Sequence, residues 1–218
     1  NTTGSQNVGL GMGTLTANTT AANNTAVGYN SLSANTTGAQ NTAVGHTAGA
    51  GITTGDYNQA FGYQSMSGGT VTGDSNSGFG AATLYALTSG TRNSALGRSS
   101  LSANTTGDNN TALGTQALQA NTTADGNTAV GYAALNVNTT GAANVALGQF
   151  ALLANTTGAT NTAIGRDALT ANTTAANNTA VGASALSAST TAAENVAVGR
   201  LSAVAVTTGS SNVFLGYN

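Results

Sequence analysis

Small, polar and large apolar residues recur along this chain with one period that is kept from end to end. The segment 24–28, Asn-Thr-Ala-Val-Gly, recurs unchanged at 41–45, 127–131 and 178–182. In the looser form Asn-x-small-apolar-Gly, the segment begins at thirteen anchors: Asn7, Asn24, Asn41, Asn58, Asn76, Asn93, Asn110, Asn127, Asn144, Asn161, Asn178, Asn195 and Asn212. The spacing is 17 residues, except for one step of 18 between the fourth and fifth anchors. A register held over this length identifies an internal repeat.

The repeat unit predicts an all-β fold. Its consensus, N-T-A-V-G-x-x-A-L-x-A-N-T-T-G-x-x, is too short for a helical hairpin repeat, and its Thr and Val residues between glycines favour short strands. We therefore predict a parallel β-solenoid, of the β-roll or β-helix type, with 13 coils of a 17-residue repeat. We expect one continuous domain over residues 1–218 without separate caps. A local bulge near Gly68 and Gly69 is expected to absorb the extra residue.

Aligned positions of the repeat form columns that can be assigned to faces. The position before the motif glycine is large and apolar in every coil, as in Val27, Val44, Leu113, Val130, Ile164 and Val181. We predict that this column points into the coil, which leaves the anchor alanines outside as a stripe suited to packing between copies. The alternative is that alanine simply fits a tight inner corner. A second inward column is expected at Leu32 and its equivalents, with Ala34 and Thr36 on the same face. The position after the motif glycine varies freely and is expected to face solvent.

Two positions of the motif do not vary. One is the motif glycine, which includes Gly28, Gly45, Gly114, Gly131, Gly165 and Gly182. A corner that needs a positive φ, or a close approach of two backbones, explains this glycine. The other is the anchor asparagine, which includes Asn24, Asn41, Asn110, Asn127, Asn161 and Asn178. We predict that these side chains stack into a hydrogen-bonded ladder along the solenoid axis.

At this motif the sequence resembles the head repeats of trimeric autotransporter adhesins, the YadA-like heads, which carry Asn-Ser-Val-Ala-Ile-Gly-type segments. It is also similar to the Asn-Thr-Ala-Ile-Gly and Asn-Thr-Thr-Gly repeats of phage-type tail fibres and large bacterial surface proteins. The resemblance covers essentially the full chain, and it implies a left-handed parallel β-roll with three chains side by side. The present unit is a few residues longer than the adhesin head repeat, and segment 34–38 makes up the difference.

Composition narrows the classes of function. Only 5% of the residues are charged, the net charge is −2, and Lys and Arg together number 4, so nothing steers the chain toward nucleic acid or anionic lipid. The absence of Cys removes disulfides, iron–sulfur clusters and thiol catalysis. No apolar run approaches the roughly 20 residues that span a bilayer, so we expect no membrane insertion.

Candidate chemistry is sparse. Asp56, Asp74, Asp108 and Asp125 each lie two residues before an anchor asparagine, so carboxylates on adjacent coils could hold Ca²⁺ or act as acid and base. A turn role for these aspartates is the interpretation we favour. The lone His46 lies in the outward column without recurring ligand partners. We therefore predict no enzyme activity, no metal and no cofactor.

Asparagine also begins a second recurring triplet, Asn-Thr-Thr, at Asn35 and its equivalents. The triplet matches the glycosylation acceptor pattern, but the repeat itself demands this triplet, so turn chemistry is the explanation we favour. The two threonines also offer hydroxyl and methyl groups, but adjacent residues alternate faces, so we expect one exposed threonine per coil.

The function predicted from these patterns is that of a non-enzymatic structural protein of an extracellular fibre, adhesin head or self-assembling filament, built by stacking of coils. We expect it outside the cell or on a cell or virion surface. The expected partner is a second copy, in a side-by-side homotrimer or a head-to-tail filament, and a host surface or glycan could be a further partner. The alternative is an ice-binding or glycan-binding solenoid that uses outward Thr and Asn rows.

Overall fold

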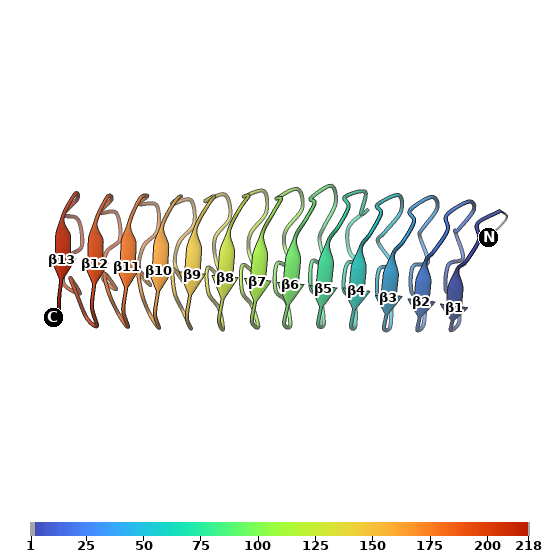
Figure 1. The fold of residues 1–218 in the computed structure, drawn as a ribbon, viewed down its shortest axis with the longest axis horizontal. Coiled ribbons are helices and arrows are strands. Elements are labelled where there is room, and N and C mark those ends of the chain that lie inside the picture. The colour runs from blue at the N-terminus through green and yellow to red at the C-terminus, as the bar shows by residue number, and fades with distance from the viewer. Residues whose placement is uncertain (1–2, 218) are drawn as a thin grey trace. The chain divides into compact units, whose positions relative to one another are not determined.

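The fold is all-β, as a computed structural model describes it for residues 3–217. Thirteen three-residue strands follow one another in chain order, one at each anchor, which confirms the predicted parallel β-solenoid (Figure 1). The first six are β1 (Val8–Leu10), β2 (Thr25–Val27), β3 (Thr42–Val44), β4 (Gln59–Phe61), β5 (Ser77–Phe79) and β6 (Ser94–Leu96). The others are β7 (Thr111–Leu113), β8 (Thr128–Val130), β9 (Val145–Leu147), β10 (Thr162–Ile164), β11 (Thr179–Val181), β12 (Val196–Val198) and β13 (Val213–Leu215). Across residues 3–217, no helix is long and apolar enough to cross a membrane.

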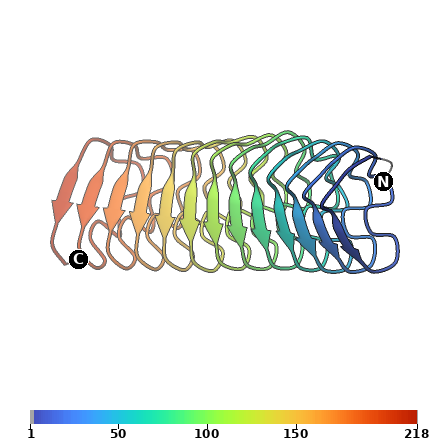
Figure 2. The same cartoon turned by 45° about the vertical axis from the view of Figure 1, so that its right-hand side comes forward.

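The chain divides into two compact units, residues 1–109 and 110–218, and each is described by itself. Within each unit a strand pairs in parallel with the next one at the same position of the repeat. Thr25 pairs with Thr42 in the first unit, for example, and Thr162 pairs with Thr179 in the second. Strands lie along one side of the coils and the return turns along the other (Figure 2). The single domain expected over residues 1–218 stays a prediction.

The one irregular step lies in the first unit. The strand register moves by 18 residues there, since Gln59 pairs with Ser77. The return turn absorbs the extra residue between Met66 and Gly73, the region in which we predicted a bulge. An isolated bridge joins Ile52 to Val71 at this place.

The interior of most coils is narrow and holds one large side chain. The predicted second inward column is confirmed, because Leu32, Leu118 and Leu152 are fully buried, as are their equivalents in most coils. The prediction for Ala34 and Thr36 is wrong, since both are only half-buried. That part of the coil is a turn rather than a strand, so side chains do not alternate there with a period of two.

The anchor asparagines form the predicted ladder. From Asn24 to Asn195 they are fully buried, and the side-chain oxygen accepts a hydrogen bond from the backbone N–H of the next anchor: Asn127 donates to Asn110 at 2.9 Å, and Asn178 donates to Asn161 at 3.0 Å. Their side-chain amides also donate to a carbonyl of the next return turn, as Asn161 does to Ala175 at 2.8 Å. Neighbouring coils are therefore joined by side chain as well as by backbone.

A second ladder runs along the return side, where the Asn-Thr-Thr triplets begin. Asn138 donates to the side-chain oxygen of Asn121 at 3.0 Å and to the carbonyl of Gly141 at 2.9 Å. The series is interrupted in the first unit, where Ile52, Val71 and Leu87 fill the interior instead. These asparagines are buried, so the triplet serves the coil rather than presenting a glycosylation acceptor on the folded surface.

Both reasons that we gave for the motif glycine, a positive φ and a close approach of two backbones, are confirmed. Gly131 has a φ of 132°, a left-handed conformation that disfavours other residues. A Cβ on Gly131 would lie 2.7 Å from the carbonyl oxygen of Gly148 on the next coil. The other glycines of this column repeat the positive φ.

Candidate functional site

The face assignment of the strands is the main correction to the sequence-based picture. In every strand from β2 to β12 the middle residue is buried and the two flanking residues point outward, the reverse of our expectation. The anchor alanines, including Ala26, Ala112 and Ala146, are at most 2% exposed. The column predicted to be inward lies on the surface instead: Val27, Val44, Val130 and Val181 are half-buried, while Leu113 and Ile164 are 43% and 38% exposed.

The buried anchor asparagine explains this orientation. Asn41 points inward to the ladder, so alternation along the strand sends Thr42 outward, Ala43 inward and Val44 outward. Space is the second reason. A Cβ placed on Gly49 would lie 3.0 Å from both the Cβ of Ala43 and a methyl of Leu32, which shows how closely the strand and the turn approach. Only a small residue fits opposite the leucine column.

The outward residues form a regular surface that we call the strand face, made of the first and third residues of every strand. The first position holds threonine in six strands, serine in two, glutamine in one and valine in four, of which Val145, Val196 and Val213 lie in the second unit. The third position holds a large apolar residue in every coil. Phe61 and Phe79 stack there with their ring centroids 4.8 Å apart. Each unit therefore carries a row of hydroxyl and methyl groups beside a row of exposed apolar side chains.

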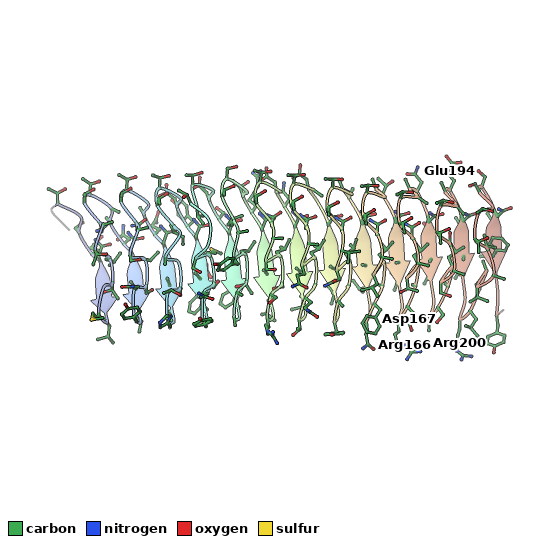
Figure 3. The ribbon with its side chains drawn as sticks, turned by 180° about the vertical axis from the view of Figure 1, so that it is seen from behind. Arg166, Asp167, Glu194 and Arg200 are labelled. Atoms are coloured by element: carbon green, nitrogen blue, oxygen red, sulfur yellow. The ribbon has the colours of Figure 1, made fainter. Side chains whose placement is uncertain are left out.

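Charge is confined to the edges and turns. No strand residue in the described part of the chain is charged. Figure 3 shows Arg166 and Arg200 extending from one edge of the coils and Glu194 from the opposite edge. Arg166 pairs with the neighbouring Asp167 at 3.1 Å, and Arg200 lies over the ring of Tyr217. The strand face is thus an uncharged surface between polar borders.

The candidate aspartates take up structural positions. The carboxylate of Asp56 accepts a hydrogen bond from the backbone N–H of Ala39 at 2.7 Å, and Asp74 accepts from Asp56 at 2.8 Å. Asp108 accepts from both the backbone and the hydroxyl of Thr91. Asp125 is exposed. Between residues 3 and 217, no group of three or more His, Asp or Glu side chains could hold a metal ion.

The outward column after the motif glycine is confirmed. Met12, Tyr29 and Tyr63 are exposed, and His46 is exposed between the two tyrosines. The ring of His46 stacks on Tyr29 at 5.1 Å and on Tyr63 at 5.5 Å. This stack stiffens one border of the strand face in the first unit, and sequence reasoning missed it because it treated His46 in isolation.

Comparison with protein-family models, curated proteins and solved structures finds no match for the chain. The resemblance to adhesin heads and fibre repeats therefore rests on the repeat motif alone, and the strand face is the feature from which function is argued.

Proposed function

We propose that this chain is a non-enzymatic structural protein of an extracellular fibre, adhesin head or filament, in which copies associate side by side through their strand faces. The observation that carries the proposal is the continuous row of apolar side chains in each unit, all of them exposed or half-buried. Phe79, Leu96, Leu147 and Val198, for example, are 37%, 51%, 41% and 40% exposed. A contiguous apolar patch of this kind is uncommon on a monomer and marks an interaction surface.

The energy available supports an extended interface. Covering the exposed part of one such aliphatic side chain contributes roughly 1 kcal/mol. The seven strands β7–β13 together offer a sum comparable with the entropic cost of association, which is about 4–15 kcal/mol. Each coil contributes little, so association depends on many coils lying in register.

A second copy is the partner that fits this surface best. The face is uncharged, and its rows repeat at the strand spacing of about 4.8 Å, so the same surface on another copy matches it in period and polarity. The resemblance to adhesin heads adds the expectation of a trimer. The proposed location, outside the cell or on a cell or virion surface, follows from the same resemblance.

Light scattering and sedimentation velocity of the intact chain test the proposal. We expect an oligomer for the parent and dissociation for the double variant Leu147→Lys/Ile164→Lys, because two charges then lie in the apolar row. Gln149→Lys adds a charge to an exposed position outside the strand face and should leave the oligomer intact. A parent that stays monomeric at high concentration, or a double variant that associates as the parent does, would overturn the interface.

One observation favours a second candidate function, ice binding. We expected a single exposed threonine per coil at pairs such as Thr36 and Thr37, and Thr37 is indeed the exposed member. The strand face, however, offers two parallel rows, such as Thr162 and Thr179 beside Ile164 and Val181. A rigid, uncharged grid of hydroxyl and methyl groups is the kind of surface that can match a crystal lattice.

Ice recrystallisation separates the two functions. For ice binding, the parent should inhibit crystal growth at micromolar concentration, and Thr162→Tyr should abolish inhibition without lowering the unfolding temperature. If the parent does not inhibit ice growth, or if Thr162→Tyr inhibits it as well as the parent does, ice binding is contradicted and the structural function is the one supported.

A further inference from the structure

Tyr85 breaks the regularity of the return side in the first unit. The residue that follows the inward leucine is serine in both adjacent coils, Ser67 and Ser102, whereas this coil carries a tyrosine that is 39% exposed. The ring rests against Gly68: a Cβ built there would lie 2.6 Å from Cζ and 2.7 Å from Cδ1 of Tyr85. The extra residue of the repeat and the glycines beside it thus make the space that the ring occupies.

A groove of about 460 Å³ opens beside this ring. With Tyr85 as one wall, it is lined by Gln64, Ala82, Ala86, Ser99, Ser102 and Ala103. The groove exists because one bulky ring stands among small side chains: the position of Ala82 and Ser99 holds Gln116 or Phe150 in other coils. None of the lining residues is charged.

We propose that this groove binds a neutral saccharide. A half-exposed tyrosine ring offers an apolar surface to the C–H face of a sugar ring, together with a polar hydroxyl. The Gln64 amide and the Ser99 hydroxyl supply both donors and acceptors for sugar hydroxyls. The volume lies in the range of about 300–1,000 Å³ that is usual for small-molecule sites.

Charge selects the class of saccharide. An Arg or Lys in the lining would favour a carboxylate, sulfate or phosphate through charge-assisted hydrogen bonds, and the groove has neither. The groove is also built from return turns rather than from strands, so this site is independent of the strand face and of the function proposed for it.

Titration of the ¹⁵N-labelled chain with maltotriose, cellotriose and chitotriose, followed by NMR, tests the proposal. We expect at least one of these sugars to shift the amide signals of Ser99 and Ser102 at millimolar concentration. Tyr85→Ala should weaken this binding at least tenfold. Tyr57→Ala removes another exposed tyrosine, outside the groove, and should leave the binding unchanged.

A filling variant keeps the test decisive if Tyr85→Ala disturbs the fold. Ala82→Gln blocks the groove while the ring stays, and the coil accepts glutamine there, because Gln64 and Gln116 hold the same left-handed conformation at equivalent positions. We expect Ala82→Gln to abolish binding. Failure of all three sugars to bind, binding by Ala82→Gln equal to that of the parent, or tighter binding of a sialylated trisaccharide would overturn the proposal.

Discussion

The side-chain oxygen of Asn24 accepts a hydrogen bond from the backbone N–H of Asn41, 2.9 Å away on the next coil. Asn41 in turn accepts from Asn58 at 2.8 Å, and its amide donates to the carbonyl of Gly55 at 2.8 Å. A buried amide that both donates and accepts across coils is why no other residue occurs at the anchor. A buried backbone group without such a partner would be costly.

Asn144→Ala is therefore expected to destabilise the second unit strongly. The substitution leaves the backbone N–H of Asn161 without its acceptor, whereas the carbonyl of Gly158 loses one of two donors and keeps Asn155. An unsatisfied buried group costs about 1–3 kcal/mol, so the free energy of unfolding should fall by roughly that amount in urea denaturation. Thr157→Ala, at an exposed position, is the control and should change it little. Equal stability of the two variants would mean that the ladder contributes nothing.

The face assignment predicts opposite outcomes for two adjacent residues. Ala146 is fully buried and Leu147 is 41% exposed. Ala146→Leu overfills the interior and should lower the free energy of unfolding by about 1–3 kcal/mol or more. Leu147→Ala should cost well under 1 kcal/mol in the dissociated chain, measured by thermal melting at low concentration. If Leu147→Ala were the more destabilising of the two substitutions, Leu147 would be the buried residue and Ala146 the exposed one, as the size of the residues first suggested.

Two glycines of the second unit should respond differently to the same change. Gly131→Ala meets both a left-handed φ of 132° and the backbone of the next coil, so we expect a loss of at least about 2 kcal/mol. Gly209→Ala lies in a column that already holds Ala124 and Ala175, and a Cβ there would lie 3.4 Å from its nearest neighbour, so its cost should be small. Chemical denaturation of both variants provides the comparison, and similar losses would show that backbone conformation is not the cause.

The end of the second ladder offers a stabilising substitution. The side-chain oxygen of Asn172 and the hydroxyl of Ser189 are both buried without hydrogen-bond partners, because Ser189 occupies the position where the next asparagine would stand. Ser189→Asn should extend the ladder and raise the free energy of unfolding by about 1 kcal/mol. Ser187→Asn adds the same side chain at a half-buried position outside the ladder and should give no gain. A melting temperature that rises equally in both variants would contradict this reading.

The period alone was enough to predict the solenoid, the leucine column, the anchor ladder and the site of the extra residue. It did not predict which face of the strand is buried, because large apolar residues were assumed to lie inside. Size restriction was the signal that could have decided it. The middle residue of the strand is never larger than alanine, except for Phe214 in the last coil. The residue that follows it ranges in size from valine to phenylalanine. A column with an upper limit on volume is one that packs against something.

The second ladder and the Tyr85 groove were beyond the reach of the sequence for different reasons. Asn35 and its equivalents match both a turn and a glycosylation pattern, and only the spacing between coils in three dimensions shows that their amides meet. The groove depends on the absence of bulk at Ala82 and Ser99 beside one ring, and a single sequence gives no information about empty space.

The inward leucines have one more consequence. Leu118, Leu135 and Leu152 hold φ values of 50–51°, and two further positions in most coils are also left-handed. A non-glycine residue in this conformation costs on the order of 1 kcal/mol, so a coil without neighbours is unfavourable and gains its stability only by stacking. Under force applied along the axis, each unit should unfold one coil at a time. The force–extension curve should then show evenly spaced unfolding events, separated by about the contour length of one repeat. Such a chain would act as an extensible shock absorber, and its length could change by whole coils without altering the coils that remain.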